Sequence, residues 1–383
     1  MKKVLIYRYE LLPYSQTFIK AQAEALKSWD YMYLTNKITP EISIDPSKII
    51  LIPKILRNRF IKDHLGFLHR FFYRRFIHKL KTMNFGLLHA HFGTDAVRVA
   101  GVAEDLNIPL VVTLHGTDIN VYREIWESGA MGKRHVNYPN ELLEIALNDR
   151  VHFVAVSYAL KNRAIEFGIP SEKVTVCYIG VDTERFTAHR QTAENRDILF
   201  VGRMIENKGV KILINAFAKV HSIIPQAKLL LIGDGPEMQS CMQLAQSLML
   251  PVVFLGKLPA NKVAEYLNQS RVFCLPSYTI ESGASEGLGM VILEAQACGI
   301  PVVTSARGGA TEAIVDGKTG FAFPEKDEEK LSQYLVKLLQ DDLLVERMSI
   351  NAVAHVRQKF DINRCVEQLE CIYDSLIFDR GDK

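Results

Sequence analysis

The sequence predicts two parallel α/β domains of the Rossmann-like type. Short apolar runs alternate with amphipathic helical stretches along the whole chain, which is typical of parallel sheets with helices on both faces. The chain has 383 residues, enough for two domains of ordinary size. A polar run at 187–197 lacks apolar periodicity and separates the two series of strands, as a linker does.

In the first half, one amphipathic stretch predicts a helix at Thr17–Lys27, and short aliphatic runs predict strands. The predicted strands are Lys3–Tyr7, Tyr31–Thr35, Leu87–His91, Leu110–Leu114, Phe153–Val156 and Val174–Tyr178. Ligands of such folds bind at the carboxyl ends of the strands. The residues that follow each run are therefore the candidates for a site.

The second half repeats this pattern. Its predicted strands are Ile198–Val201, Lys228–Ile232, Val252–Leu255, Arg271–Leu275, Val302–Thr304 and Gly320–Phe323. Its predicted helices are Lys208–Val220, Met238–Ser247, Lys262–Gln269, Met290–Cys298 and the whole tail from Lys330. We expect residues 1–185 and 186–361 to form the two domains, with a C-terminal helix at about 362–383 packing back on the first.

Composition argues against several classes of protein. With 48% hydrophobic and 23% charged residues, the chain resembles neither a disordered nor a membrane-embedded protein. A net charge of +3 argues against a dedicated nucleic-acid binder. The six cysteines show no CxxC and no Cys/His metal spacing, so we expect small core residues in a reducing cytoplasm. Arg8 and Glu10 interrupt the first apolar run, and no run approaches the roughly 18 apolar residues of a membrane-spanning helix.

The stretch Ser277–Pro301 carries the strongest local signal. Glu286 precedes a turn with two glycines, a helix is expected from Met290, and Glu294 lies on that helix. A helix N-terminus offers free N–H donors and a favourable dipole to an anion, and glycines let a phosphate approach the backbone. The stretch therefore predicts a phosphate site flanked by two carboxylates that can accept hydrogen bonds from sugar hydroxyls. The alternative is a strand–helix junction with two solvated glutamates.

Two further stretches contain residues suited to ligand binding. Arg203 and Lys208 flank the turn after a predicted strand, where a guanidinium fork and an ammonium charge would suit a diphosphate, although both could be solvated surface charges. The turn Gly233–Pro236 has the wrong spacing for a dinucleotide fingerprint. His115 follows a predicted strand and is a candidate ligand contact, whereas we expect His89 to be a structural histidine. A metal site is disfavoured because no carboxylate-rich partner motif accompanies the histidines.

Taken in order, these motifs resemble the retaining GT-B glycosyltransferases of family 4. The spacing from Glu286 to Glu294 is similar to the E-x7-E signature of that family, and the resemblance continues through Gly308–Glu312 and Asp316–Gly320. Upstream, the resemblance includes Gly202–Gly209, Gly233–Pro236 and Gly180–Phe186. The resemblance covers nearly the whole chain and implies two Rossmann-like domains facing each other across a cleft.

The resemblance also implies roles for individual residues. Glu286 would hydrogen-bond the donor sugar, Glu294 would hold the ribose, and Arg203, Lys208 and the N–H groups of Gly287–Gly289 would take the diphosphate. His115 would reach across the cleft to the sugar or phosphate. The residues expected in catalysis are Glu286, Arg203, Lys208 and His115. Those expected to bind substrate are Glu294, Gly287, Leu288, Gly289, Gly235, Ser15, Thr17 and Asp118.

No metal and no cofactor are expected beyond a UDP- or GDP-sugar donor. The cations and the helix dipole would stabilise the leaving group. Family members retain the anomeric configuration, and since no carboxylate is placed as a nucleophile, we expect attack from the face of the departing phosphate. The N-terminal loop departs from the commonest family pattern and is similar to that of colanic-acid and related exopolysaccharide enzymes, with Gln16 in place of Glu. That change concerns the acceptor more than the reaction.

The expected function is sugar transfer from a nucleotide-diphosphate sugar to a glycan, in capsule, exopolysaccharide or lipopolysaccharide synthesis. One alternative is another GT-B enzyme, such as a sugar-nucleotide epimerase, or transfer to a small soluble acceptor. A phosphorylase would release phosphate without a nucleotide, and no pyridoxal-phosphate lysine context is evident. A non-catalytic binding module is a third possibility, against which the intact Glu286, Glu294, Arg203 and Lys208 argue.

Residues 54–81 bear on whether the enzyme binds a membrane surface. Nine Lys and Arg residues are interleaved with aromatic and aliphatic ones and oppose a single acid, Asp63. Such a helical stretch can lie on an anionic membrane surface. The alternative is a core helix with a solvated basic face. The exopolysaccharide enzymes that this chain resembles use polyprenyl-diphosphate-linked acceptors, which favours a cytoplasmic enzyme docked on the inner face of the cell membrane.

Overall fold

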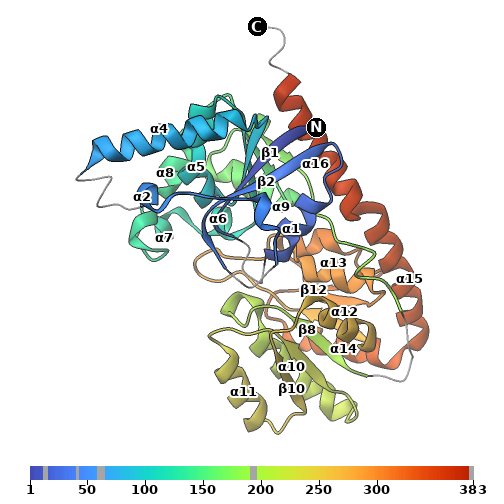
Figure 1. Cartoon of the computed structure of the whole chain (residues 1–383). Coiled ribbons are helices and arrows are strands. Elements are labelled where there is room, and N and C mark those ends of the chain that lie inside the picture. The colour runs from blue at the N-terminus through green and yellow to red at the C-terminus, as the bar shows by residue number, and fades with distance from the viewer. Residues whose placement is uncertain (12–15, 40–42, 58–64, 190–195, 379–383) are drawn as a thin grey trace. The chain divides into compact units, whose positions relative to one another are not determined.

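The computed structural model describes residues 1–11, 16–39, 43–57, 65–189 and 196–378. The chain forms two compact units (Figure 1). The first contains Met1–Val156, Leu160–Ile179 and Asn363–Lys383, and the second contains Ser157–Ala159 and Gly180–Ile362. Each unit is built on one parallel sheet, so the predicted fold class is confirmed.

Within the described residues, the sheet of the first unit has the strand order β3-β2-β1-β4-β5-β6-β7, and all pairs are parallel. The strands are β1 (Lys2–Leu11), β2 (Trp29–Ile38), β3 (Ile49–Leu51), β4 (Leu87–His91), β5 (Leu110–Leu114), β6 (Val151–Ala155) and β7 (Val174–Val176). Every residue of β4 and β5 is buried, as expected of strands covered on both faces. The direction of strand addition reverses between β1 and β4.

Helices cover this sheet, and their N-terminal ends follow the carboxyl ends of the strands. They are α1 (Thr17–Glu24), α2 (Lys54–Arg57), α4 (Gly66–Thr82), α5 (Gly93–Leu106), α6 (Thr117–Asn120), α7 (Arg123–Glu127), α8 (Tyr138–Ala146) and α9 (Tyr158–Phe167). The last helix of the chain, α16 (Ile362–Phe378), contributes to the core of this unit. No helix in the described part of the chain is long and apolar enough to cross a membrane.

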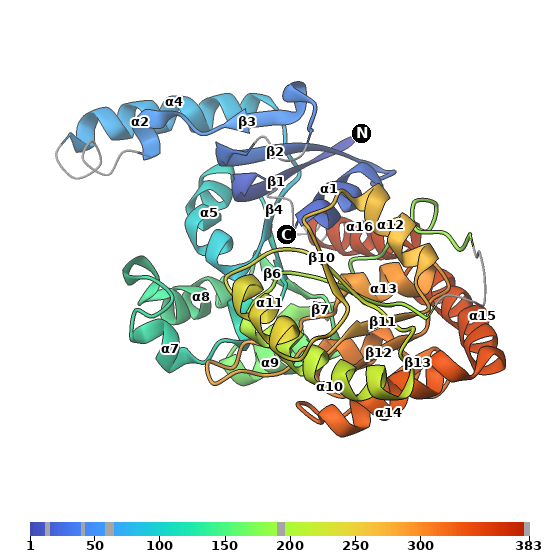
Figure 2. The ribbon, with the colours of Figure 1, turned by 90° about the horizontal axis from the view of Figure 1, so that it is seen from below.

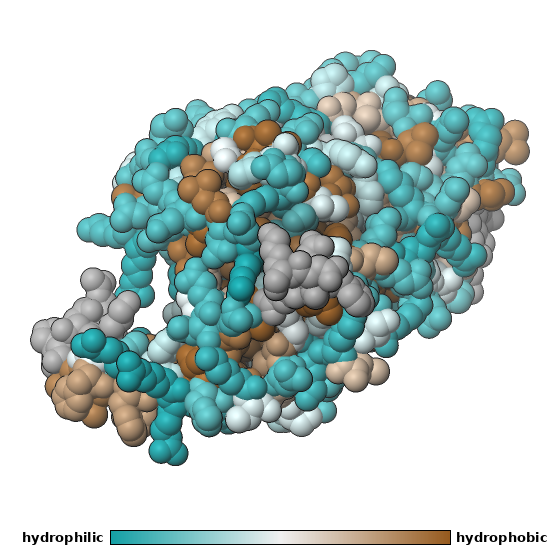
Figure 3. Space-filling model, turned by 90° about the horizontal axis from the view of Figure 1, so that it is seen from above, coloured by the Kyte–Doolittle hydropathy of each residue, from teal (hydrophilic) through white to brown (hydrophobic). Residues whose placement is uncertain are grey.

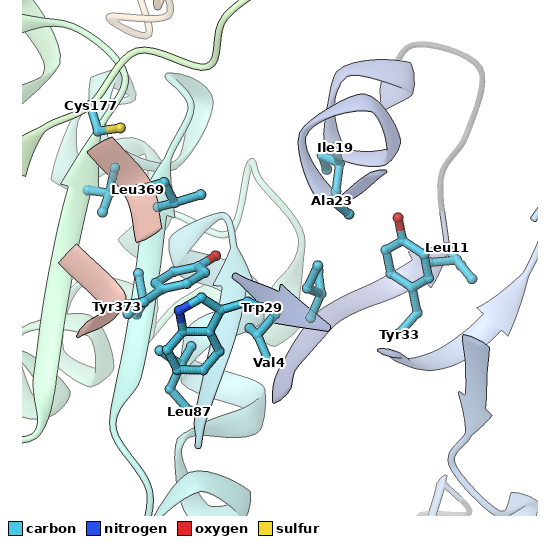
Figure 4. Close-up of a cluster of buried hydrophobic side chains, with 13 residues drawn as sticks. Val4, Leu11, Ile19, Ala23, Trp29, Tyr33, Leu87, Cys177, Leu369 and Tyr373 are labelled. Atoms are coloured by element: carbon cyan, nitrogen blue, oxygen red, sulfur yellow. The ribbon is translucent and has the colours of Figure 1, made fainter. Parts of the chain in front are cut away.

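The side chains of α16 explain why the C-terminus belongs to the first unit. Tyr373 packs edge-on against the buried ring of Trp29 at a centroid distance of 5.3 Å, as Figure 4 shows. Asp374 accepts a hydrogen bond from Trp29 Nε1 at 2.9 Å, and Glu370 accepts from the backbone N–H groups of Lys27 and Ser28 at 2.8 and 2.7 Å. The helix therefore anchors the start of β2 by both packing and hydrogen bonds.

The second unit contains a parallel sheet with the order β10-β9-β8-β11-β12-β13 among the described residues. The strands are β8 (Ile198–Val201), β9 (Leu229–Ile232), β10 (Val252–Gly256), β11 (Val272–Leu275), β12 (Val302–Ser305) and β13 (Gly320–Phe323). The helices are α10 (Val210–Ile223), α11 (Met238–Ser247), α12 (Ala260–Gln269), α13 (Met290–Ala297), α14 (Glu328–Gln340) and α15 (Asp342–Lys359). Helices α10 and α14 pack side by side (Figure 2). Here the order reverses between β8 and β11.

Several predicted boundaries were wrong, each for a local reason. The helix predicted from Lys208 begins only at Val210, because Gly209 adopts a left-handed φ of 69° and Lys208 ends a 3-10 turn. Helix α1 ends at Glu24 and does not reach the predicted end at Lys27. The backbone N–H of Lys27 donates its hydrogen bond to the Glu370 side chain. The three-residue edge strand β3 was missed because it is too short to show a period. Two short interruptions, one residue at Asp341 and two residues at 360–361, divide the predicted helical tail into α14, α15 and α16.

Candidate active site

Four loops converge at the carboxyl edge of the second sheet. They follow β8, β9, β11 and β12, the four central strands of that sheet. Gly233 has a φ of 130°, and a Cβ there would lie 1.8 Å from the Gly202 carbonyl oxygen. A Cβ at Gly309 would lie 1.8 Å from the Gly287 oxygen. Glycine is therefore required for these loops to pack backbone against backbone.

A buried ion pair spans the point where the strand order of this sheet reverses. Lys208, after β8, places its Nζ 2.5 Å from Oε2 of Glu286, after β11. Only 13% of the Glu286 side chain is exposed, and Ser277 Oγ donates to the same carboxylate at 3.2 Å. Burial alone would raise the pKa of Glu286, but the charge and hydrogen bond of Lys208 lower it below its ordinary value. The solvated-glutamate alternative is thus wrong for Glu286.

Glu294 has a different environment. It lies one turn into α13 and forms no ion pair or side-chain hydrogen bond with any residue that the structure describes. Burial raises the pKa of its carboxyl to about 7, and the charge of Arg185 only partly offsets this. Its oxygens therefore have acceptor capacity that no neighbouring donor uses.

The N-terminus of α13 starts directly after the glycine turn. Gly289 is the N-cap residue, with a φ of 78°, and no side chain of the described residues caps the helix. Leu288 is 3% exposed, so its side chain packs in the core and offers no surface to a ligand. The start of α13 thus lies beside Glu286, as the sequence predicted, and the Gly287 N–H already hydrogen-bonds to the Glu286 carboxylate.

Arg203 and Gly235 complete this edge of the sheet. Arg203 is exposed and its guanidinium forms no hydrogen bond or ion pair with the described residues, in contrast to the Lys208 ammonium. Gly235 packs on the loop after β8, since a Cβ there would lie 2.3 Å from the Met204 carbonyl oxygen. The two cations therefore differ: one is held in place by a carboxylate, and the other is free to meet an anion.

The predicted residues of the first unit lie at the ends of β4 and β5. His115 Nε2 lies 3.0 Å from His91 Nδ1, and burial lowers the pKa of both rings well below the ordinary value, so both are neutral. Asp118 is buried and accepts hydrogen bonds from the N–H groups of Gly93, at 3.0 Å, and Gly116, at 2.8 Å. Its carboxylate thereby joins the loops after β4 and β5.

The remaining first-unit predictions have simpler outcomes. Thr17 is the first residue of α1 and is partly buried, whereas Ser15 lies outside the described residues. His89 is a satisfied structural histidine, as predicted, with Tyr373 Oη at 2.5 Å and Thr113 Oγ1 at 2.7 Å from its ring nitrogens. No group of His, Cys, Asp and Glu in the described ranges is arranged to hold a metal ion.

Sequence reasoning missed a second buried ion pair, in the first unit. Arg8, near the end of β1, pairs with Asp95 at the start of α5 and also donates to the His91 carbonyl oxygen at 3.1 Å. Tyr9 N–H donates to Asp95 at 3.0 Å. The available signal was a charged residue within an apolar strand. Ser277 was also missed, because a serine in a polar loop carries no distinguishing pattern.

Comparisons with known proteins agree with this geometry. The family described as glycosyl transferases group 1 matches residues 182–355, and that described as glycosyltransferase family 4 matches residues 23–185. N-acetyl-alpha-D-glucosaminyl L-malate synthase of Bacillus anthracis is 30% identical over 77% of this chain and 76% of its own length. The amylovoran biosynthesis glycosyltransferase AmsK of Erwinia amylovora is 28% identical over 70% of this chain and 64% of its own length.

Solved structures share the fold. The Anabaena protein HepE, crystallised in complex with UDP and glucose, superimposes with a TM-score of 0.79. The superposition covers 98% of this chain and all of that protein, at 20% sequence identity.

Proposed function

The chain belongs to the GT-B glycosyltransferases of group 1 and family 4, and from this membership we propose that it transfers a sugar from a nucleotide-diphosphate sugar to a glycan acceptor. The observation that carries the proposal is the Lys208–Glu286 ion pair at the strand-order reversal of the second sheet. Ligands of parallel α/β sheets bind at this point. The pair lies beside the uncapped N-terminus of α13, which is suited to phosphate.

The donor diphosphate would bind to Lys208, Arg203 and the N–H groups of Gly287–Gly289. Lys208 would then exchange its contact with Glu286 for a phosphate oxygen, leaving the carboxylate to accept hydrogen bonds from sugar hydroxyls. Glu294 would accept from the ribose hydroxyls, since its oxygens have no other donor among the described residues. Gly235 would allow the loop after β9 to approach the ligand.

In the reaction, the bond between the anomeric carbon and the diphosphate oxygen breaks, and a bond to an acceptor hydroxyl oxygen forms. The hydroxyl proton passes to the departing phosphate oxygen. Lys208 and Arg203 would stabilise the charge that develops on the leaving group, an effect for which removal of one donor typically costs about 10²–10³-fold in turnover. We propose attack on the same face, with retention of configuration and no metal ion. The neutral ring of His115 would donate one hydrogen bond to the sugar or phosphate.

The decisive experiment is a panel of UDP-, GDP- and ADP-sugars tested for hydrolysis and for protection against thermal unfolding. A bound nucleotide stabilises the protein by about 2.7 kcal/mol at a hundredfold excess over its dissociation constant. We expect one nucleotide to protect wild type and a Lys219→Ala variant equally, and to protect Lys208→Ala clearly less, by about half as much or below. Lys219 is a matched control, because it forms an exposed ion pair with Glu329 at 2.7 Å near the opposite end of α10. Absence of protection by every sugar nucleotide would refute the proposed donor.

The acceptor is proposed to be a lipid-linked glycan in surface polysaccharide synthesis, reached from the membrane. Helix α4 supports this proposal. Its side chains Phe67 and Phe71 are 68% and 56% exposed, and only Phe76, Ile77 and Leu80 are buried. The helix contains no acid. Its five Lys and Arg residues are all exposed and form no ion pair with a described residue: Arg70, Arg74, Arg75, Lys79 and Lys81.

Exposed rings next to unpaired cations suit an anionic bilayer, where each cation contributes about 1 kcal/mol. Figure 3 shows hydrophobic and hydrophilic side chains side by side at the left end of the molecule, where α4 begins. Co-sedimentation with liposomes tests this docking. We expect binding to anionic but not neutral liposomes, weakened by salt and by roughly a hundredfold in an Arg70→Glu, Arg74→Glu, Arg75→Glu variant. If liposome binding depends neither on lipid charge nor on these substitutions, docking is refuted and a soluble acceptor is favoured.

A further inference from the structure

A cavity of about 370 Å³ opens in the first unit at the carboxyl ends of β1, β4 and β5. Its volume lies within the range of about 300–1,000 Å³ that is usual for small-molecule sites. It lies at the point where the strand order of the first sheet reverses, between β1 and β4. Parallel α/β sheets bind their ligands at this position. The cavity is therefore a candidate for a second substrate site.

Each carboxylate that lines this cavity is compensated. Asp95 is paired with Arg8. Glu10 is paired with Lys37 at 2.6 Å. Asp118 accepts from backbone N–H groups, as described above, including that of His115 at 3.2 Å. An anionic ligand therefore meets no carboxylate in the lining without a counter-charge or a set of hydrogen-bond donors.

Arg98 of α5 is different, because it lines the cavity and forms no ion pair with a carboxylate of the described residues, and the nearby Asp95 is already paired with Arg8. It is exposed, donates to His135 Nε2 at 2.8 Å and lies over the Tyr9 ring at 4.4 Å from the ring centroid. These contacts hold the guanidinium in place without neutralising it. A guanidinium held in this way loses little side-chain freedom when it binds a carboxylate or phosphate.

Trp126 of α7 supplies the second, independent observation. Its side chain lines the cavity and is 3% exposed, yet its Nε1–H has no hydrogen-bond partner in the described part of the chain. Buried donors are nearly always satisfied, so this one lacks an acceptor that a ligand oxygen entering beside the ring would supply. An indole group and hydroxyl groups from Thr94 and Thr117 suit a sugar ring.

We propose that this cavity binds the acceptor sugar, and that the acceptor carries an oxyanion, a carboxylate or a phosphate, that pairs with Arg98. The Trp126 Nε1–H donates to an oxygen of the same sugar. Arg98 is thus a specificity-determining residue that favours acidic over neutral glycans. The identification of the ligand as an acceptor rests on the proposed glycosyl transfer, but the binding of an acidic sugar does not.

Binding of three sugars to the full chain tests the proposal: methyl β-D-glucuronide, glucose 6-phosphate and methyl β-D-glucoside. Calorimetry or ligand-observed NMR at constant ionic strength gives their affinities. Wild type should bind one or both acidic sugars more tightly than the neutral glucoside, and the better acidic probe identifies the oxyanion. Arg98→Gln should lose about tenfold or more of that affinity, the usual effect of losing a charge-assisted hydrogen bond, and should bind the glucoside as wild type does.

Arg134→Gln is the matched control, since Arg134 is an exposed arginine next to His135 that does not line the cavity. It should bind all three sugars as wild type does. Trp126→Phe keeps a ring and removes the N–H, and should weaken binding of acidic and neutral sugars alike. Equal affinity of wild type for acidic and neutral sugars, or an Arg98→Gln variant with wild-type affinities, would overturn the proposal. Equal losses in Arg98→Gln and Arg134→Gln would also do so.

Nucleotide binding separates this proposal from the proposed function. Arg98→Gln should bind the same UDP or GDP ligand as wild type, because Arg98 is outside the proposed donor site. If wild type binds acidic sugars through Arg98 but binds no nucleotide, the cavity proposal stands and the proposed function fails. If wild type binds a nucleotide but binds acidic and neutral sugars equally, the proposed function stands and the cavity proposal fails.

Discussion

The two sheets place an ion pair at the same topological position, yet the two pairs have different environments. In the first unit, Arg8 and Asp95 have side chains that are 11% and 5% exposed, and each also hydrogen-bonds to the backbone. In the second, the Lys208 and Glu286 side chains are 21% and 13% exposed, and the Lys208 ammonium has no partner but Glu286 among the described residues. Burial raises the pKa of Asp95 despite Arg8, whereas Lys208 lowers that of Glu286 despite burial.

This difference indicates different uses of the same position. The Arg8–Asp95 pair is embedded in backbone hydrogen bonds, so it holds β1 and α5 together. The Lys208–Glu286 pair has spare hydrogen-bonding capacity on both partners and lies beside the N-terminus of α13, which no side chain of the described residues caps, so a ligand can replace one contact with another. We therefore expect mutations in the first pair to affect stability and those in the second to affect turnover.

The largest expected effect on stability follows from breaking the first pair. Asp95→Ala leaves the Arg8 guanidinium buried without a counter-charge, and such changes typically lower the free energy of unfolding by about 3–5 kcal/mol. Chemical denaturation measures it. The control is Glu265→Ala, which removes an exposed pair with Lys262 at 2.8 Å and should cost less than about 1 kcal/mol. Equal losses in the two variants would show that the first pair has no special structural role.

Turnover is the readout for the second pair. Glu286→Gln removes the charge that holds Lys208 and the acceptor proposed for the sugar hydroxyls, so turnover should fall by about 10²–10³-fold. Lys208→Ala and Arg203→Ala should each lower turnover by a similar factor through lost leaving-group stabilisation. Circular dichroism should show each variant folded. Wild-type turnover in Glu286→Gln would refute the role of Glu286. Wild-type turnover in both Lys208→Ala and Arg203→Ala would mean that the diphosphate binds elsewhere.

Much of the fold follows from the sequence for a simple physical reason. Strands buried on both faces are continuous apolar runs, and four of them were predicted to the residue, for example β4 and β5. The donor-site candidates were also predictable, since glycines, cations and carboxylates recur at fixed distances around the strand ends. The predicted positions of Glu286, Lys208 and the α13 N-terminus agree with the structure.

The contacts between distant residues could not be predicted in this way. Arg8 meets Asp95 only because β1 pairs with β4 in one register, which pairs Tyr7 with Ala90. The orphan Nε1–H of Trp126 depends on packing that no local pattern encodes. The exposed face of α4 was also undecided, because an apolar residue at helical spacing can face either a core or solvent.

Glu294 gives a smaller effect, which depends on pH. Its carboxyl has a pKa of about 7 in the folded chain against an ordinary value of 4.5, so the folded state binds the proton more tightly than the unfolded state. This contribution to stability is present below about pH 4.5 and is lost as the pH rises through about 7. Glu294→Gln should therefore be more stable than wild type at pH 8 by about 1–3 kcal/mol, and the difference should vanish near pH 4.5. A pH-independent difference would contradict the pKa assignment.

The smallest expected effect is that of a chelator. Lys208, Arg203 and the α13 N-terminus can together balance the charge of a diphosphate, so turnover should be unchanged by EDTA. The assay compares chelated and untreated enzyme with the same donor. Complete loss of activity, restored by a divalent cation, would show that the second site depends on a metal.

The most direct test of the central claim is the affinity of Lys208→Ala for the nucleoside diphosphate that wild type binds, measured together with its free energy of unfolding. The account predicts that affinity falls by about tenfold or more, since a charge-assisted contact to phosphate is lost. It also predicts that unfolding changes much less than in Asp95→Ala and that Lys219→Ala changes neither quantity. Wild-type nucleotide affinity in Lys208→Ala, with a stability loss as large as that of Asp95→Ala, would show that the second ion pair is structural as well.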